Sequence, residues 1–165
     1  MNRPPSNRLS LLLAAGLLPL LAGAAPPAHD TMATSPHVVL QAAQMQWGDG
    51  PPFLPKGVQA TVLSGDPAST GTFVLRLKAP PHAVIPMHWH PSDEHVTVIQ
   101  GDLTVSTDDG TPPQALDAGG YALMPAKMHH EVNTRQGAIV QVSGTGPFAI
   151  TYVDPAKDPR NATAK

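Results

Sequence analysis

Prolines interrupt this chain so often that a long α-helix has little room to form in most of it. The 165 residues include 20 prolines and 14 glycines, and prolines recur from Pro36 to Pro159. A proline ring removes a backbone N–H donor and clashes with the preceding helical turn. No stretch after residue 30 therefore predicts a long uninterrupted helix.

Short runs rich in Val, Ile, Thr and aromatic residues occupy the same region, and turn residues separate them. Ten such runs predict strands: Val38–Ala42, Val58–Ser64, Thr72–Leu77, Ala83–His90, Glu94–Gln100, Leu103–Thr107, Tyr121–Met124, His130–Thr134, Ala138–Val142 and Phe148–Val153. Gly101-Asp102 predicts a tight reversal between the fifth and the sixth. Many short strands without a helix predict one all-β domain, either a sandwich, a jelly roll or a barrel.

The composition excludes several classes of function. The chain has no cysteine, which excludes disulfides, thiolate metal ligands and a cysteine nucleophile. Charged residues make up only 13% and the formal net charge is −2. No basic patch indicates a nucleic acid or a membrane surface as a partner. A small-molecule ligand or substrate remains the expected partner.

The N-terminus has the features of a bacterial Sec-type signal peptide. Arg3 and Arg8 are followed by the apolar run Leu9–Leu21 and by Ala22-Gly23-Ala24, a small-residue cleavage pattern. We therefore expect a signal peptide over 1–24, a flexible linker over 25–36 and a barrel domain over 37–154. A polar C-terminal tail over 155–165 is expected to fray. Export would place the mature protein in the periplasm or outside the cell, with no membrane segment left.

Scarce metal-binding residue types cluster in the middle of the chain. Six of the eight histidines and both glutamates lie between His82 and Glu131. His88 and His90 are two residues apart in a predicted strand, so both imidazoles share a face and can reach one ion. Glu94 opens the next predicted strand and can offer its carboxylate to the same ion. The catalytic residues are not identifiable from the sequence.

A further ligand must come from a more distant segment, where His129 and His130 are both candidates. In a regular strand His130 shares its face with Val132, whereas His129 shares its face with Glu131 and Asn133. An apolar barrel interior favours the first set. The alternation therefore selects His130 as the ligand and leaves His129 more exposed.

These residues resemble the two motifs of the cupin family. His88, His90 and Glu94, with Gly101 seven residues later, resemble the first motif, and Gly119, Pro125 and His130 are similar to the second. In the second motif a proline precedes the metal histidine by five positions, which also selects His130. Two residues depart from the motif, because Lys127 stands in place of a glycine and Thr134 in place of an asparagine.

The resemblance implies a jelly-roll barrel with a metal site of three histidines and one carboxylate: His88, His90, Glu94 and His130. A carboxylate ligand favours Mn, Fe, Zn or Ni and disfavours copper, although three methionines lie near the motifs. Cupins include dioxygenases and isomerases as well as non-catalytic sensors and carriers, so the resemblance permits either an enzyme or a binding protein. Cupins often form homodimers, but this sequence does not identify the residues of an interface.

Overall fold

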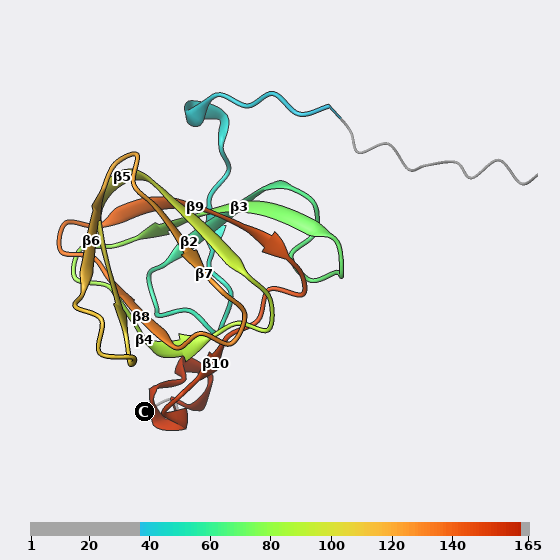
Figure 1. Ribbon diagram of the computed structural model, residues 1–165. Helices are drawn as coiled ribbons and strands as arrows, with labels where there is room; N and C mark the ends of the chain where they lie inside the picture. The colour runs from blue at the N-terminus through green and yellow to red at the C-terminus, as the bar shows by residue number, and fades with distance from the viewer. Residues whose placement is uncertain (1–36, 163–165) are drawn as a thin grey trace, which may run out of the picture. The chain divides into compact units, whose positions relative to one another are not determined.

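The computed structural model describes residues 37–162, which belong to one compact unit. The predicted signal peptide and linker lie outside the described residues. Figure 1 shows a barrel of curled strands. Its strands are β1 (Gly48–Asp49), β2 (Gln59–Ser64), β3 (Thr72–Ala79), β4 (Val84–Trp89), β5 (Glu94–Thr107), β6 (Gln114–Asp117), β7 (Tyr121–Met124), β8 (His130–Asn133), β9 (Ala138–Thr145) and β10 (Thr151–Tyr152). The all-β jelly-roll prediction is confirmed.

The strands form two antiparallel sheets that share β5. The first half of β5 pairs with β9 and β7, and β9 continues through β3 and β2 to β1. The second half of β5 pairs with β8 and β6, and β8 continues through β4 to β10. Because one strand belongs to both sheets, the two sheets face each other across a common interior.

The continuity of β5 corrects one sequence prediction. Residues 94–100 and 103–107 were expected to be two strands joined by a tight reversal at Gly101-Asp102, but they form one strand. The register against β9 shifts between Val98 and Gln100, and Gly101 has a φ of 82°. The chain therefore bends at a β-bulge instead of reversing, and this bend carries it from one sheet into the other.

Alternating residues of the long strands fill the interior. Phe73, Leu75 and Leu77 of β3 are buried, as are alternate apolar residues of β5 and β9. Complete burial of a Val or Leu side chain contributes about 1.5–3 kcal/mol. The apolar interior, rather than any polar cluster, therefore supplies most of the folding free energy.

The ends of the described chain also differ from the prediction. Val38–Leu40 is exposed and forms no strand, and a 3-10 helix, η1 (Ala42–Gln44), follows it. The sequence did not predict β1 or β6. Within the expected tail, residues 155–161 are not frayed but form two 3-10 helices, η2 (Pro155–Lys157) and η3 (Pro159–Asn161). The Arg160 guanidinium donates to the Ile150 carbonyl at 3.2 Å and anchors this tail.

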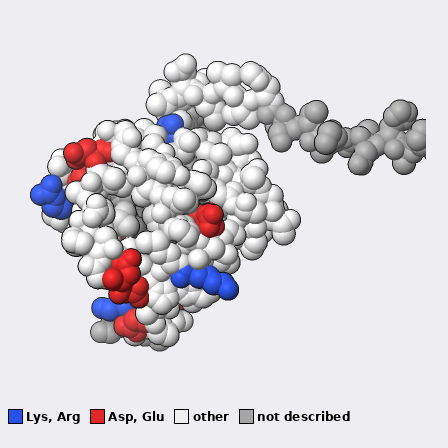
Figure 2. Space-filling model, viewed as in Figure 1, with Lys and Arg blue, Asp and Glu red and all other residues white. Residues whose placement is uncertain are grey.

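The surface carries few charges. Figure 2 shows small separate groups of acidic and basic side chains on a face that is otherwise uncharged. Among residues 37–162, no helix is long and apolar enough to span a bilayer.

Candidate metal centre

A β-bulge in β4 turns His88 into the barrel. Ile85 pairs with Val132 and His88 pairs with His130, so β4 has one residue more than β8 over this interval. Pro86 lies within the bulge, where its missing N–H costs no ladder hydrogen bond. As a result Ile85 and His88, three residues apart, both line the interior.

Beside His90, the turn after β4 and the turn before β8 are joined by two hydrogen bonds. The Asp93 carboxylate accepts a hydrogen bond from the Ala126 N–H at 2.8 Å, and the Lys127 N–H donates to the His90 carbonyl at 2.8 Å. Lys127 has a φ of 66°, a conformation that glycine adopts with less strain. The turn thus requires a positive φ at the position where the cupin motif usually has glycine, and here lysine adopts it.

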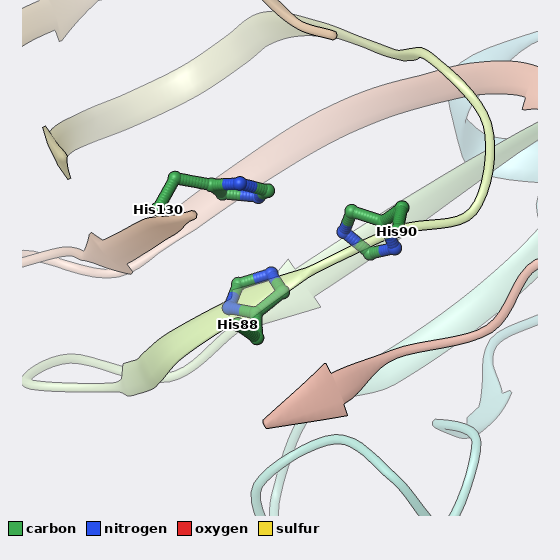
Figure 3. A group of neighbouring side chains, drawn as sticks. All are labelled: His88, His90 and His130. Carbon is green, nitrogen blue, oxygen red and sulfur yellow. The ribbon is translucent and has the colours of Figure 1, made fainter. Parts of the chain in front are cut away.

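The structure brings the four predicted ligands together. His88, His90 and His130 are buried and each offers one ring nitrogen within 4.8 Å of the others. Figure 3 shows their rings converging from β4, from the turn after it and from β8. The Glu94 Oε2 atom, at the start of β5, lies 3.3 Å from His90 Nε2 and 3.5 Å from His130 Nε2.

Backbone carbonyls fix the orientation of all three rings. The Nδ1 atoms of His88, His90 and His130 lie 2.7, 2.8 and 3.0 Å from the carbonyl oxygens of Pro86, Ala149 and Met128 respectively. A carbonyl only accepts, so each Nδ1 carries the proton and donates it. In a neutral ring this leaves the lone pair on Nε2. Metal-binding histidines are oriented in the same way, by a hydrogen bond from the other ring nitrogen.

Burial and the Glu94 charge set the protonation of the cluster. Burial, together with the neighbouring imidazoles, lowers the pKa of His88 to about 3. For His90, burial acts to lower the pKa, but the close contact with Glu94 and its charge outweigh burial and raise the pKa above 6.5. Burial acts to raise the pKa of Glu94, but the close contacts with the His130 and His90 imidazoles outweigh it and lower the pKa. His88 is therefore neutral near pH 7, whereas Glu94 is ionised and favours the protonated form of His90.

Two further histidines that follow the motifs closely, His95 and His129, lie outside the cluster. The side chain of His129 is 39% exposed, and its Nδ1 lies 2.7 Å from the Asp108 carboxylate. His95 is half-buried on the opposite face of β5 from Glu94, and its Nδ1 lies 2.7 Å from the Tyr121 hydroxyl. Strand alternation in the sequence likewise puts each of these two side chains on the face away from the predicted ligand beside it.

Sequence reasoning missed two aromatic neighbours of the cluster. Phe148 stacks on the His90 ring, with centroids 5.4 Å apart and planes 14° apart. The Tyr152 ring lies 5.9 Å from that of His88, and its hydroxyl donates to the Phe53 carbonyl at 2.7 Å. These contacts join segments that are far apart in the sequence, by 99 residues for Phe53 and Tyr152, so no local spacing could have indicated them.

The donor set of the cluster fits a transition-metal ion. The Nε2 atoms of His90 and His130 are buried, and neither makes a well-aligned hydrogen bond with a described residue. Their nearest polar neighbour is Glu94 Oε2, at 3.3 Å and 3.5 Å. A buried polar atom without a partner is costly, and a metal ion is one ligand that would satisfy both. Three imidazoles and a carboxylate are the donors that such an ion takes.

Comparison with solved structures shows that the fold is that of the cupins. The polyketide cyclase RemF from Streptomyces resistomycificus is 15% identical, with a TM-score of 0.63 over 75% of this chain and 90% of its own. An RmlC-like cupin from Shewanella frigidimarina is 16% identical, with a TM-score of 0.55 over 67% and 92%. A candidate acetylacetone dioxygenase from Methylibium petroleiphilum is 20% identical, with a TM-score of 0.59 over 75% and 85%. At these identities the similarity defines the fold and not the activity.

A comparison of the sequence with protein-family models assigns the protein to one family. The family model described as a domain of unknown function, DUF4437, matches residues 21–151, and the chain belongs to that family. No curated protein matches the sequence significantly.

Proposed function

We propose that this protein is a cupin enzyme that binds one divalent transition metal and acts on a small organic molecule. The ligands are the three clustered histidines, His88, His90 and His130, together with Glu94. The carboxylate favours manganese, iron, zinc or nickel over copper. The reaction is an oxidation of the dioxygenase type or an isomerisation.

The two buried Nε2 atoms of His90 and His130 carry this proposal. They converge with His88 on a point beside Glu94, and every ring is already oriented by a backbone carbonyl. Holding two buried ring nitrogens without a well-aligned hydrogen bond, beside a single carboxylate, costs stability, which a purely structural role would not explain. This cost is explained if the Nε2 atoms of the cluster are arranged to bind a metal ion.

The protein's own groups would bind and orient the metal and the substrate. A bound metal supplies Lewis-acid polarisation of a substrate oxygen and, for iron or manganese, access to redox chemistry. Glu94 contributes the one negative charge, and Phe148 holds the His90 ring by stacking. A mainly apolar cavity lies next to the cluster. Similar folds carry the names of a candidate dioxygenase and of a dimethylsulfoniopropionate lyase from Ruegeria pomeroyi, which supports an enzyme.

Elemental analysis tests the metal. Protein purified without a metal-chelating tag should contain about one transition-metal ion per chain. The matched variants His88→Ala and His82→Ala separate the site from adventitious binding, since His82 is exposed and does not belong to the cluster. Metal-free wild-type protein from native cells would overturn the proposal.

Turnover decides between an enzyme and a binding protein. Oxygen uptake or product formation should follow when the iron- or manganese-loaded protein meets a panel of small ketones, aldehydes and amides. His88→Ala should abolish the reaction and His82→Ala should retain it. A protein that is only stabilised by one of these compounds, without any product, would be a sensor or carrier instead.

We also propose that the protein is exported. The two arginines, the Leu9–Leu21 run and Ala22-Gly23-Ala24 support cleavage to a mature N-terminus at or within a few residues of Ala25. Mass spectrometry of the protein from its native host measures that terminus. An intact Met1 or Asn2 in the soluble fraction would contradict export.

A further inference from the structure

The cavity beside the metal cluster has a mainly apolar wall, and its ionisable residues all come from that cluster. Its volume is about 50 Å³, and its ionisable wall residues are His88, His90 and Glu94. All three belong to the metal cluster. Aliphatic side chains and Phe148 make up most of the remaining wall: Leu54, Val58, Leu77, Ala79, Ala83, Ile85, Val96, Leu103, Val132, Ala138, Val140, Val142, Phe148 and Ile150. Among the described residues, no lysine or arginine lines the cavity.

The two other polar residues of the wall offer little to a ligand. Thr134 is buried, its N–H donates to the Ala83 carbonyl at 3.1 Å, and its hydroxyl lies 3.5 Å from the Asp102 carboxylate. Asn133 is uncharged and partly buried. A charged group placed in the cavity away from the cluster would therefore lack a counter-ion.

The volume limits how much of a substrate can enter. A single water needs roughly 10–15 Å³ in this measure, and a cavity of roughly 150 Å³ holds benzene. A cavity of about 50 Å³ is thus about a third of the size that holds benzene and has room for only a few heavy atoms.

We propose that the substrate is a one-ended molecule: a polar group that faces the histidine cluster, attached to a small uncharged aliphatic group that fills the cavity. This inference rests on the proposed metal-dependent function. A substrate with a second charged end would bury that charge against apolar walls with no counter-ion, which is unfavourable. Dicarboxylates and phosphorylated sugars are excluded on this ground.

Leu54 sets the size of the aliphatic group. It is 4% exposed and comes from the segment 50–58 rather than from a barrel strand. Its own N–H donates to the Pro51 carbonyl at 2.9 Å, and the adjacent Phe53 is held by the Tyr152 hydroxyl and by an edge-to-face contact with Phe148. The segment is fixed by contacts that do not involve the Leu54 side chain, so truncating that side chain enlarges the cavity.

The charge preference is tested with two amides of the same shape. 3-Methylbutanamide and malonamate share the amide end, and differ in that an isopropyl group replaces a carboxylate. Binding is followed by NMR through the methyl resonances of Leu54 and Leu77, in chelator-treated and in zinc-loaded protein. 3-Methylbutanamide should bind about tenfold more tightly or better in both samples. Equal or tighter binding of malonamate in the chelator-treated protein, or no shift of these methyls by the amide, would overturn the inference.

The size limit is tested with matched leucine variants. Leu54→Ala opens the cavity, whereas Leu123→Ala removes the same atoms from a side chain that is 45% exposed on β7. The affinity ratio of 4-methylpentanamide to 3-methylbutanamide should rise about tenfold in Leu54→Ala and stay unchanged in Leu123→Ala. An unchanged ratio in both variants would show that Leu54 does not limit the substrate.

The two proposals fail in different ways. The amide preference in chelator-treated protein depends only on the cavity, so it is measured even if the cluster binds no metal. Absence of metal in the purified protein would overturn the proposed function and leave the cavity measurement standing. Protein that contains metal as purified, but that binds malonamate as tightly as 3-methylbutanamide after chelator treatment, would overturn only the substrate class.

Discussion

His129 and His130 are neighbours in sequence but lie in opposite environments. His130 is completely buried in the cluster, whereas His129 is partly exposed and paired with Asp108. We expect His130→Ala to lose most of its bound metal and His129→Ala to keep most of it, because only the first removes a converging Nε2. Metal content of the two variants, purified side by side, is the measurement. Equal losses, or a larger loss from the His129 variant, would contradict the assignment.

The positions of the candidate ligands followed from sequence rules at the scale of single residues. Strand alternation put His88 and His90 on one face, and the five-residue spacing from Pro125 agreed with alternation in selecting His130. The structure brings these residues together with Glu94. Their supporting contacts could not be predicted, because Phe148 and the Ala149 carbonyl reach His90 through the tertiary fold.

At the scale of the element, Gly101 decides the course of β5. Its φ of 82° lies in the left-handed region, and a Cβ there would collide with the Gly137 carbonyl. Gly110 has a similar φ of 85° but open space around it, which makes it a matched control. We expect Gly110→Ala to lower the free energy of unfolding by about 1 kcal/mol from backbone strain alone. Gly101→Ala should lower it by about 3 kcal/mol or more, because the collision adds to the strain.

Urea denaturation of the two variants measures the difference. Equal losses would mean that the Gly137 carbonyl moves aside at no cost and that the bend tolerates a side chain. Insoluble Gly101→Ala beside well-folded Gly110→Ala would agree with the expectation.

The same glycine explains why the sequence prediction of β5 was wrong. A glycine at positive φ followed by aspartate is typical of a hairpin reversal and also of a β-bulge. The apolar runs on both sides, Val96–Val98 and Leu103–Val105, pack on the core in either case. Only the pairing with β9 and β8 distinguishes the two outcomes, and that pairing is not local. Similarly, Val38–Ala42 has strand composition but no partner strand within the described residues.

Across the whole molecule, the residues that stabilise the barrel differ from those that form the metal cluster. Apolar residues of β3, β5 and β9 form the buried core, whereas the cluster places three imidazoles and a carboxylate at its edge. The fold should therefore persist without a metal, and a bound metal should add stability to it. Saturating metal at about 100 times its dissociation constant contributes about 2.7 kcal/mol. For a domain of this size that corresponds to a rise in Tm of roughly 10 °C.

The stabilisation of the barrel by a bound metal should depend on pH. An imidazole that donates from Nδ1 and binds a metal through Nε2 cannot carry a second proton, so metal binding depresses its proton affinity. Free imidazole has a pKa of about 6.5. The stabilisation is then fully present above that value and is lost as the pH falls below it. Protons compete with the metal more strongly at His90, whose pKa Glu94 raises, than at His88, whose pKa is about 3.

A chelator should therefore lower the Tm at about pH 7.5 and have little effect at about pH 4.5, where protons have already displaced the metal. His129→Ala should respond to the chelator as the wild type does, since its ring lies outside the cluster. Replacing His88, His90 and His130 together by alanine should abolish the response while the β-sheet circular dichroism remains, because the apolar core still folds. Thermal melts with and without chelator at both pH values measure this. Wild-type protein of verified metal content that melts identically with and without chelator at pH 7.5 would show that the metal does not stabilise the barrel.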